Sequence, residues 1–223
     1  MKGFTLSIIS LAFLGAAACE DDSQGIALEF APTATEGAAL SAPLTLAEGF
    51  EATRLEALVR EVKVLPGKDD DKESKETKFK AKGDFWVDAL DPDHSTIPEI
   101  PLPADTYKKV EFKFEKPSAG LGLQGTDAAI ALDATIDGTK VQVRIAKSDK
   151  VTLRHVDGIA LASGGTSTFL IDLDVPGWFD GVDVTTLEAD ADGVVLIDSQ
   201  TNKSAYDKVL DNLKATIKLL RKP

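Results

Sequence analysis

Apolar and polar residues alternate along several segments of this 223-residue chain, and that pattern restricts the fold more than any other feature. Val110, Phe112 and Phe114 are separated by charged residues, so an extended strand would place all three on one face. The same alternation runs through 129–136, 139–145 and 167–175. Between the first two of these runs stands Asp137-Gly138, which is typical of tight hairpin turns because both residues tolerate positive φ. The pattern predicts antiparallel strands, each with one buried face.

The remaining strand candidates are shorter or less regular. The stretch 52–65 fits two periods, since Leu55, Leu58 and Val62 suit a helix whereas Val62 and Val64 suit a strand; we interpret it mainly as strand. The other candidates are 25–30, 78–90, 150–156, 158–162 and 194–198. Turn residues separate the candidates at intervals of about 8–12 residues, as they do in β-sandwiches.

A helix is predicted at the C-terminal end of the chain. Apolar residues recur there at helical spacing; they are Tyr206, Val209, Leu210, Leu213, Ile217 and Leu220. Ser204 is placed to cap this helix, with Asp207 and Asp211 early in it and Lys214 and Lys218 late, which matches the helix dipole. We therefore predict a mainly β fold, an antiparallel β-sandwich with one C-terminal α-helix that covers an open edge or end of the sheets.

Residues 1–18 have the composition of a bacterial export signal. Lys2 precedes an apolar run, 4–18, that ends in small residues directly before Cys19. The run is shorter than the roughly 20 apolar residues of a membrane-spanning helix. The sequence Ala-Ala-Ala-Cys at 16–19 resembles the lipobox of bacterial lipoproteins, which implies cleavage before Cys19 and lipidation of that residue.

Ordinary cleavage after an Ala-x-Ala site is the alternative, and it would leave Cys19 as a free N-terminal thiol. Cys19 is the only cysteine of the chain and so has no intramolecular disulfide partner, which makes an unmodified exported thiol a liability. Lipidation is therefore favoured. We predict a lipoprotein signal peptide at 1–18, a lipidated tether at 19–25 and a single domain at 26–223.

The chain is acidic, with a formal net charge of −12. The segment 1–18 contains Lys2 and no acidic residue, so its removal leaves −13. A surface of this charge repels nucleic acid and anionic lipid headgroups, which are excluded as ligands. Lysines alternate with the acids of 68–78, a segment without apolar residues that we expect to form an exposed loop.

Calcium is the one metal ion for which the sequence offers an argument. Glu188, Asp190 and Asp192 alternate before Gly193, as in the first half of a calcium-binding loop, and Asp198 follows one position before the expected closing ligand. The alternative, which we favour, is an acidic turn before a strand. A second acidic group could converge if Pro176-Gly177 folds back; it consists of Asp172, Asp174, Asp180 and Asp183.

Aromatic and histidine residues give weaker signals. Trp178 and Phe179 follow Pro-Gly and could form an exposed surface that binds carbohydrate or a partner protein, but in a chain with few aromatic residues we favour the core for both. His94 lies in a turn and is expected to be solvated, and His155 could orient against Asp157. The chain has no Gly-x-Ser-x-Gly nucleophile motif and no cluster of cysteine and histidine, so neither a hydrolase nor a zinc site is favoured.

Three segments resemble one family of bacterial surface lipoproteins. They are 97–107, with Asp105 where a glycine is usual, followed by the Val110 strand; 178–183; and 192–198. The sequence is similar at these positions to the DUF4382 family, whose members have β-sandwich domains. The resemblance implies a sandwich and a surface location, and it implies no catalytic residue.

These observations lead to one expected function and one alternative. We expect a lipid-anchored β-sandwich of the bacterial cell envelope, most simply at the outer membrane and on either its periplasmic or its outer face. It would act as a binding, adhesion or structural module without enzymatic activity or a cofactor, and its partners would be the membrane and envelope proteins or polysaccharide. The alternative is a calcium-dependent carbohydrate-active or other hydrolytic enzyme of the envelope.

Overall fold

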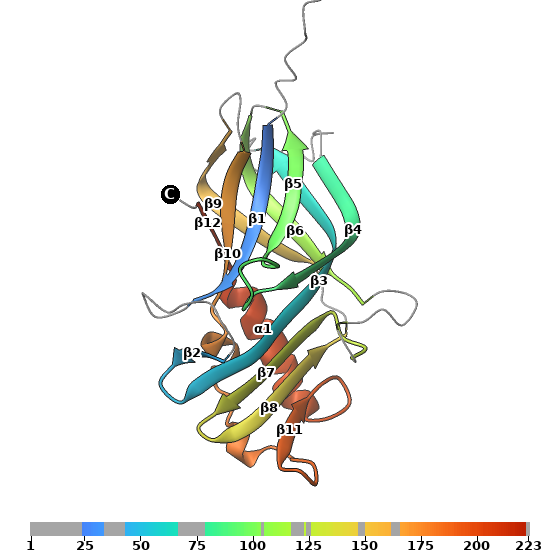
Figure 1. Cartoon of the computed structure of the whole chain (residues 1–223), viewed down its shortest axis with the longest axis vertical. Helices are drawn as coiled ribbons and strands as arrows, with labels where there is room; N and C mark the ends of the chain where they lie inside the picture. The colour runs from blue at the N-terminus through green and yellow to red at the C-terminus, as the bar shows by residue number, and fades with distance from the viewer. Residues whose placement is uncertain are drawn as a thin grey trace, which may run out of the picture.

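The computed structural model describes residues 24–33, 43–66, 79–103, 105–116, 123, 126–146, 150–161 and 166–221. These residues form two β-sheets and one α-helix, which confirms the predicted fold class (Figure 1). The predicted loop at 68–78 and the predicted signal peptide lie outside the described residues.

The small sheet has four strands in the order β12-β10-β1-β5, and the large sheet has eight. The strands of the small sheet are β1 (Gln24–Pro32), β5 (Thr96–Leu102), β10 (Thr166–Leu173) and β12 (Lys218–Arg221). The path of the large sheet, β11-β8-β7-β3-β6-β9, consists of β3 (Phe50–Pro66), β6 (Thr106–Phe114), β7 (Ile130–Ile136), β8 (Thr139–Ile145), β9 (Val151–Ala160) and β11 (Val194–Ile197). Two more strands pair with β3, namely β2 (Leu44–Ala47) and β4 (Phe79–Asp88).

Strand β3 organises the large sheet because it runs through both halves of the molecule. Its first part pairs with β2 and β7, and its second part pairs with β6 and most of β4. The pairings with β4 and with β6 both shift register between Val59 and Glu61, which is the signature of a bulge that bends and twists a strand. The predicted strand at 52–65 is thus confirmed, and β3 joins a sandwich half to a helix half (Figure 1).

In the sandwich half, the small sheet faces the part of the large sheet that contains β6. Val110, Phe112 and Phe114 of β6 are buried, as their alternation predicts. The ring of Phe112 meets Phe30 of β1 edge to face at 5.5 Å and stacks on Phe114 at 6.2 Å. Burial of each such ring stabilises the fold by about 1.5–3 kcal/mol relative to exposure, so these contacts hold the two sheets together.

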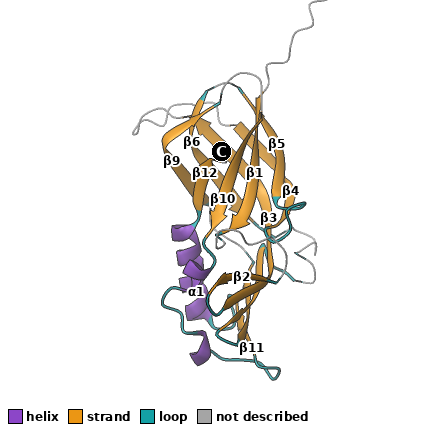
Figure 2. Cartoon of the chain, turned by 60° about the vertical axis from the view of Figure 1, so that its left-hand side comes forward, coloured by secondary structure: helices purple, strands orange, loops and turns teal. Residues whose placement is uncertain are grey.

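In the helix half, α1 (Lys203–Thr216) covers the large sheet where the small sheet does not reach (Figures 1 and 2). Its buried residues are Ala205, Tyr206, Val209 and Leu213, four of one helical face. A short 3-10 helix, η1 (Pro176–Phe179), lies against α1, and a second, η2 (Val184–Thr186), follows it. The side-chain amide of Asn212 on α1 donates to the carbonyl oxygens of Trp178 and Asp180 at 3.0 and 2.9 Å and so links α1 to η1.

The C-terminal helix is shorter than its sequence pattern predicts. It ends at Thr216, and the chain then forms β12, which pairs with β10 and leaves Leu220 exposed. Pairing with the free edge of β10 supplies backbone hydrogen bonds that outweigh the helical periodicity of this segment. The predicted cap is also wrong, because Asn202 rather than Ser204 is the N-cap residue.

The pairing of strands departs from the prediction in two places. Strand β1 runs parallel to β10, and β11 runs parallel to β8, whereas the other pairs are antiparallel. The hairpin at Asp137-Gly138 is confirmed, with φ of 47° and 81° and with Ile136 opposite Thr139. The candidates 150–156 and 158–162 belong to the single strand β9, and β1 already begins inside the predicted tether, at Gln24.

Candidate functional site

The acidic residues of the predicted calcium loop form turns. One carboxylate oxygen of Asp190 accepts hydrogen bonds from the backbone N–H groups of Asp192 and Val194, both at 2.9 Å. One oxygen of Asp198 accepts from the N–H groups of Gln200 and Thr201 at 2.7 and 2.6 Å. These contacts are those of local Asx turns, which supports the favoured alternative of an acidic turn.

Glu188 makes its contacts through its backbone rather than its carboxylate. The side-chain amide of Asn202 accepts from its N–H at 3.1 Å and donates to its carbonyl oxygen at 2.9 Å, which fixes the start of α1. Within the described part of the chain, no three His, Cys, Asp or Glu side chains are grouped closely enough to hold a metal ion. Calcium binding by Glu188, Asp190, Asp192 and Asp198 stays a prediction.

The members of the second acidic group take part in separate contacts of the fold. Asp172 accepts from the Thr33 hydroxyl at 2.6 Å, Asp174 accepts from the N–H of Gly177 at 3.2 Å, and Asp183 accepts from Thr185. Their carboxylates thus form turns and strand-end contacts within the fold.

The core position that we favoured for Trp178 and Phe179 is confirmed, and the alternative of an exposed binding surface is wrong. Trp178 is 1% exposed and Phe179 is 8% exposed. The Pro-Gly before them begins η1, in which both rings are buried, and the ring of Phe179 meets Phe50 edge to face at 5.5 Å. Among the described residues the buried indole N–H of Trp178 has no acceptor.

A small cavity lies next to Trp178, where the two sheets meet α1. Its volume is about 20 Å³, and its lining includes Phe30, Leu55, Phe114 and Leu213. Space of this size holds about one water molecule, and water is poorly bound where few polar groups line the wall. The cavity is therefore a packing feature of the core.

The exposed aromatic side chain is that of the other tryptophan, Trp86. Strand β4 alternates between an inner and an outer face, and Trp86 stands on the outer face with Lys80, Lys82 and Asp84. It is 37% exposed, and its indole ring contacts the imidazole of His94, with ring centroids 5.2 Å apart. An exposed tryptophan is a frequent anchor of binding surfaces because its large ring brings contact area with few rotatable bonds.

Carboxylates surround this ring pair. His94 Nδ1 lies 2.7 Å from a carboxylate oxygen of Asp91; His94 is exposed and Asp91 is partly exposed. The hydrogen bond with Asp91, reinforced by the charges of Asp91, Asp93 and Asp88, raises the pKa of His94, and the same hydrogen bond lowers the pKa of Asp91. We call Trp86, Asp88, Asp91, Asp93 and His94 the Trp86 patch; it stabilises a positive charge beside an indole ring.

The turn between β4 and β5 holds the Trp86 patch in place. The N–H of Asp88 donates to the carbonyl of His94 at 3.1 Å, and the N–H of His94 donates to the carbonyl of Asp91 at 3.0 Å. Ser95 is buried, and its carbonyl accepts from the N–H of Phe30 in the small sheet at 2.9 Å. The patch is thus built on a turn that is fastened to both sheets.

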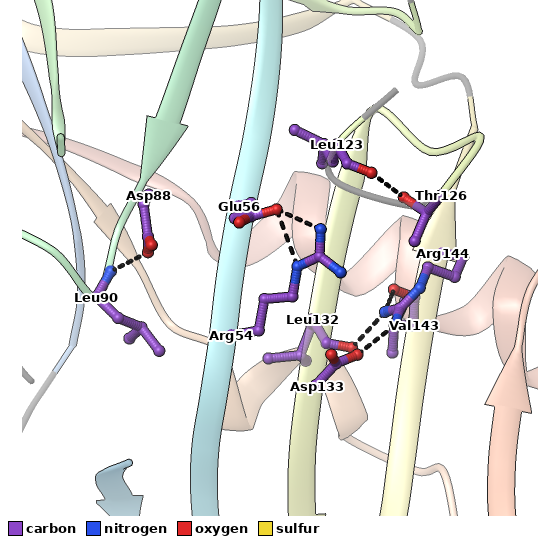
Figure 3. Close-up of polar contacts among 10 residues, drawn as sticks. All are labelled: Arg54, Glu56, Asp88, Leu90, Leu123, Thr126, Leu132, Asp133, Val143 and Arg144. Atoms are coloured by element: carbon purple, nitrogen blue, oxygen red, sulfur yellow. Dashed lines mark hydrogen bonds and ion pairs between the residues drawn. The ribbon is translucent and has the colours of Figure 1, made fainter. Parts of the chain in front are cut away.

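Elsewhere on the outer face of the large sheet, acids are matched by bases. Hydrogen bonds from Lys63 and Lys80 lower the pKa of Glu61 to about 2. Arg54 forms an ion pair with Glu56 on the same strand, β3, at 2.5 Å. Arg144 of β8 forms one with Asp133 of the neighbouring strand β7 (Figure 3). Further pairs on this face are Lys150–Glu111 and Arg60–Asp84.

The Trp86 patch differs from this paired surface. In the part of the chain that the structure describes, neither Asp88 nor Asp93 forms an ion pair with lysine or arginine. Sequence reasoning missed Trp86, although the alternation of 79–88 places it among exposed charged residues. That signal was available in the predicted strand at 78–90.

For three other residues singled out in the sequence, His155, Asp157 and Cys19, the structure does not describe the side chain. His155 lies on β9, with its side chain and that of Asp157 outside the described residues, and Cys19 is outside them altogether. Of the helices the structure describes, none has the length and apolarity to cross a membrane. Searches of protein-family models, of curated proteins and of solved structures find no match for the chain, so the resemblance to the DUF4382 family stays a prediction.

Proposed function

We propose that this chain is a lipid-anchored binding module of the bacterial cell envelope and that it binds basic side chains of a partner protein at the Trp86 patch. The export signal and Cys19 support the anchor. The observation that carries the binding role is Trp86, exposed beside Asp88, Asp91 and Asp93 on a sheet face where other acids are paired.

The chemistry of the patch favours a cationic partner group. The face of an indole ring attracts arginine and lysine, and nearby carboxylates add charge-assisted hydrogen bonds. His94 already occupies one edge of this surface, and the rise in its pKa reflects how the patch stabilises a cation there. The net charge of −13 without residues 1–18 also attracts basic partners toward the protein.

A peptide of six arginines is a direct probe for this proposal. Its affinity for the full chain can be measured by fluorescence anisotropy at low salt. Trp86→Ala should weaken binding about two- to fivefold, the effect of one exposed cation–π contact. Binding should also be stronger at pH 8 than at pH 6, because His94 loses the positive charge that competes with the peptide as pH rises through its raised pKa.

A charge-matched control separates the patch from general attraction. Asp91→Asn with Asp93→Asn should weaken binding more than Asp192→Asn with Asp211→Asn, which removes the same charge from two exposed residues elsewhere. Equal losses from the two double variants would contradict a local site. A neutral polysaccharide could instead bind the chain in a way that depends on Trp86 and not on salt. That result would contradict the proposal of a basic partner, because a sugar would then be the ligand.

A further inference from the structure

We infer that the free end of the sandwich half rests on the lipid bilayer and that the helix half points away from it. We call this free end, at which β1 begins, the near end because it lies nearest the membrane. The opposite, far end contains the Asp137-Gly138 hairpin and the turn before β11 (Figure 1). This inference rests on the proposed lipidation of Cys19 and adds the orientation that the anchored domain adopts.

The length of the tether carries the inference. Strand β1 begins at Gln24, so the chain from Cys19 to the folded domain can span at most about 18 Å. Gln24 lies opposite Leu102 of β5, and Gly25 lies opposite Thr166 of β10, so strands on both sides hold the start of β1 in the sheet. A lipid on Cys19 therefore keeps this end of the long molecule at the membrane surface.

The surface of the near end is compatible with a hydrated headgroup layer. Its described turn and strand-end residues include exposed Pro103, Asp105, Ala160 and Thr166, small or polar side chains without an exposed aromatic ring. Such residues would lie against the headgroups without inserting into the hydrocarbon.

The opposite end is exposed and acidic. Glu48, Asp137, Asp190 and Asp192 are all exposed there. Lys140 is also exposed at that end, and Asp105 is exposed at the near end, so the short tether, and not the charge of either end, sets the orientation. The β4–β5 turn, which holds the Trp86 patch, lies between the two ends, and Trp86 itself is exposed (Figure 1).

The single cysteine makes the orientation measurable. A lipidated Cys19 cannot react with a maleimide dye, so Thr166→Cys and Asp192→Cys each offer one labelling site, near and far. The natively processed variants are labelled and reconstituted in vesicles that contain an acceptor-labelled lipid. We expect clearly greater energy transfer from position 166 than from position 192.

Two controls separate the orientation from the anchor. A variant with about twelve Gly/Ser residues inserted before Gln24 gains roughly 20 Å of average reach, and its difference between the two positions should shrink. The orientation is overturned if, with the native tether, energy transfer from position 192 equals or exceeds that from position 166. This holds even if Cys19 of the wild type is not labelled by the dye. A wild type that takes up the dye at Cys19 and does not float with vesicles overturns both the anchor and the orientation.

Discussion

Phe112→Ala is expected to lower the free energy of unfolding by about 3–5 kcal/mol, the usual cost of truncating a buried aromatic ring. Phe112 is fully buried and meets Phe30 across the two sheets and Phe114 along its own strand. Its removal leaves a cavity between rings that cannot collapse without moving β1. Urea unfolding followed by circular dichroism measures the loss.

The neighbouring residue is the control for this prediction. Lys113 faces the other side of β6, is 45% exposed and pairs with Glu115 at 2.5 Å. An exposed ion pair contributes well under 1 kcal/mol, so Lys113→Ala should change stability little. Similar losses for the two variants would show that the faces of β6 are assigned wrongly.

Trp178→Ala should cost a comparable amount, about 3–5 kcal/mol. The indole ring is buried under α1, and the carbonyl of the same residue accepts a hydrogen bond from Asn212. Loss of the ring enlarges the small cavity at the junction of α1 with both sheets. The whole fold should therefore lose stability, and not only the loop that contains η1.

Trp86→Ala provides the matched comparison, because it removes the same side chain from an exposed position. A surface truncation of this kind costs about 0.5 kcal/mol. Circular dichroism is the suitable readout, since each variant removes one of the two tryptophans that dominate the fluorescence. A larger loss for Trp86→Ala than for Trp178→Ala would contradict the burial on which the account of both residues rests.

The local pattern of the sequence predicts strands well because alternation and turn chemistry act between near neighbours. Val110, Phe112 and Phe114 take the inner face that their spacing requires. Asp137 and Gly138 adopt the positive φ that a tight hairpin needs. Neither feature depends on distant parts of the chain.

Features that depend on pairing between distant segments of the chain cannot be predicted from the local sequence pattern. The segment after Thr216 has helical periodicity, yet β10 offers an unpaired edge and the chain extends to meet it. The parallel pairing of β1 with β10 joins segments about 140 residues apart, and no local signal sets its direction.

The two tryptophans show the same limit in the candidate site. Pro-Gly before Trp178 is typical of a loop, and the ring is buried only because α1 packs against both sheets at this point. Trp86 could have been found, since alternation along its strand puts it on the charged face. The surrounding Asp91 and His94 come together through the turn after the strand, whose geometry is fixed by its contact with β1.

Mass spectrometry of the natively produced protein shows whether the chain has its lipid anchor. We predict that the mature chain begins at Cys19 and that this residue carries acyl chains. Cys19→Ser should release the protein from the membrane or leave the signal peptide attached. A mature N-terminus at another residue, or an unmodified thiol at Cys19, would contradict the account.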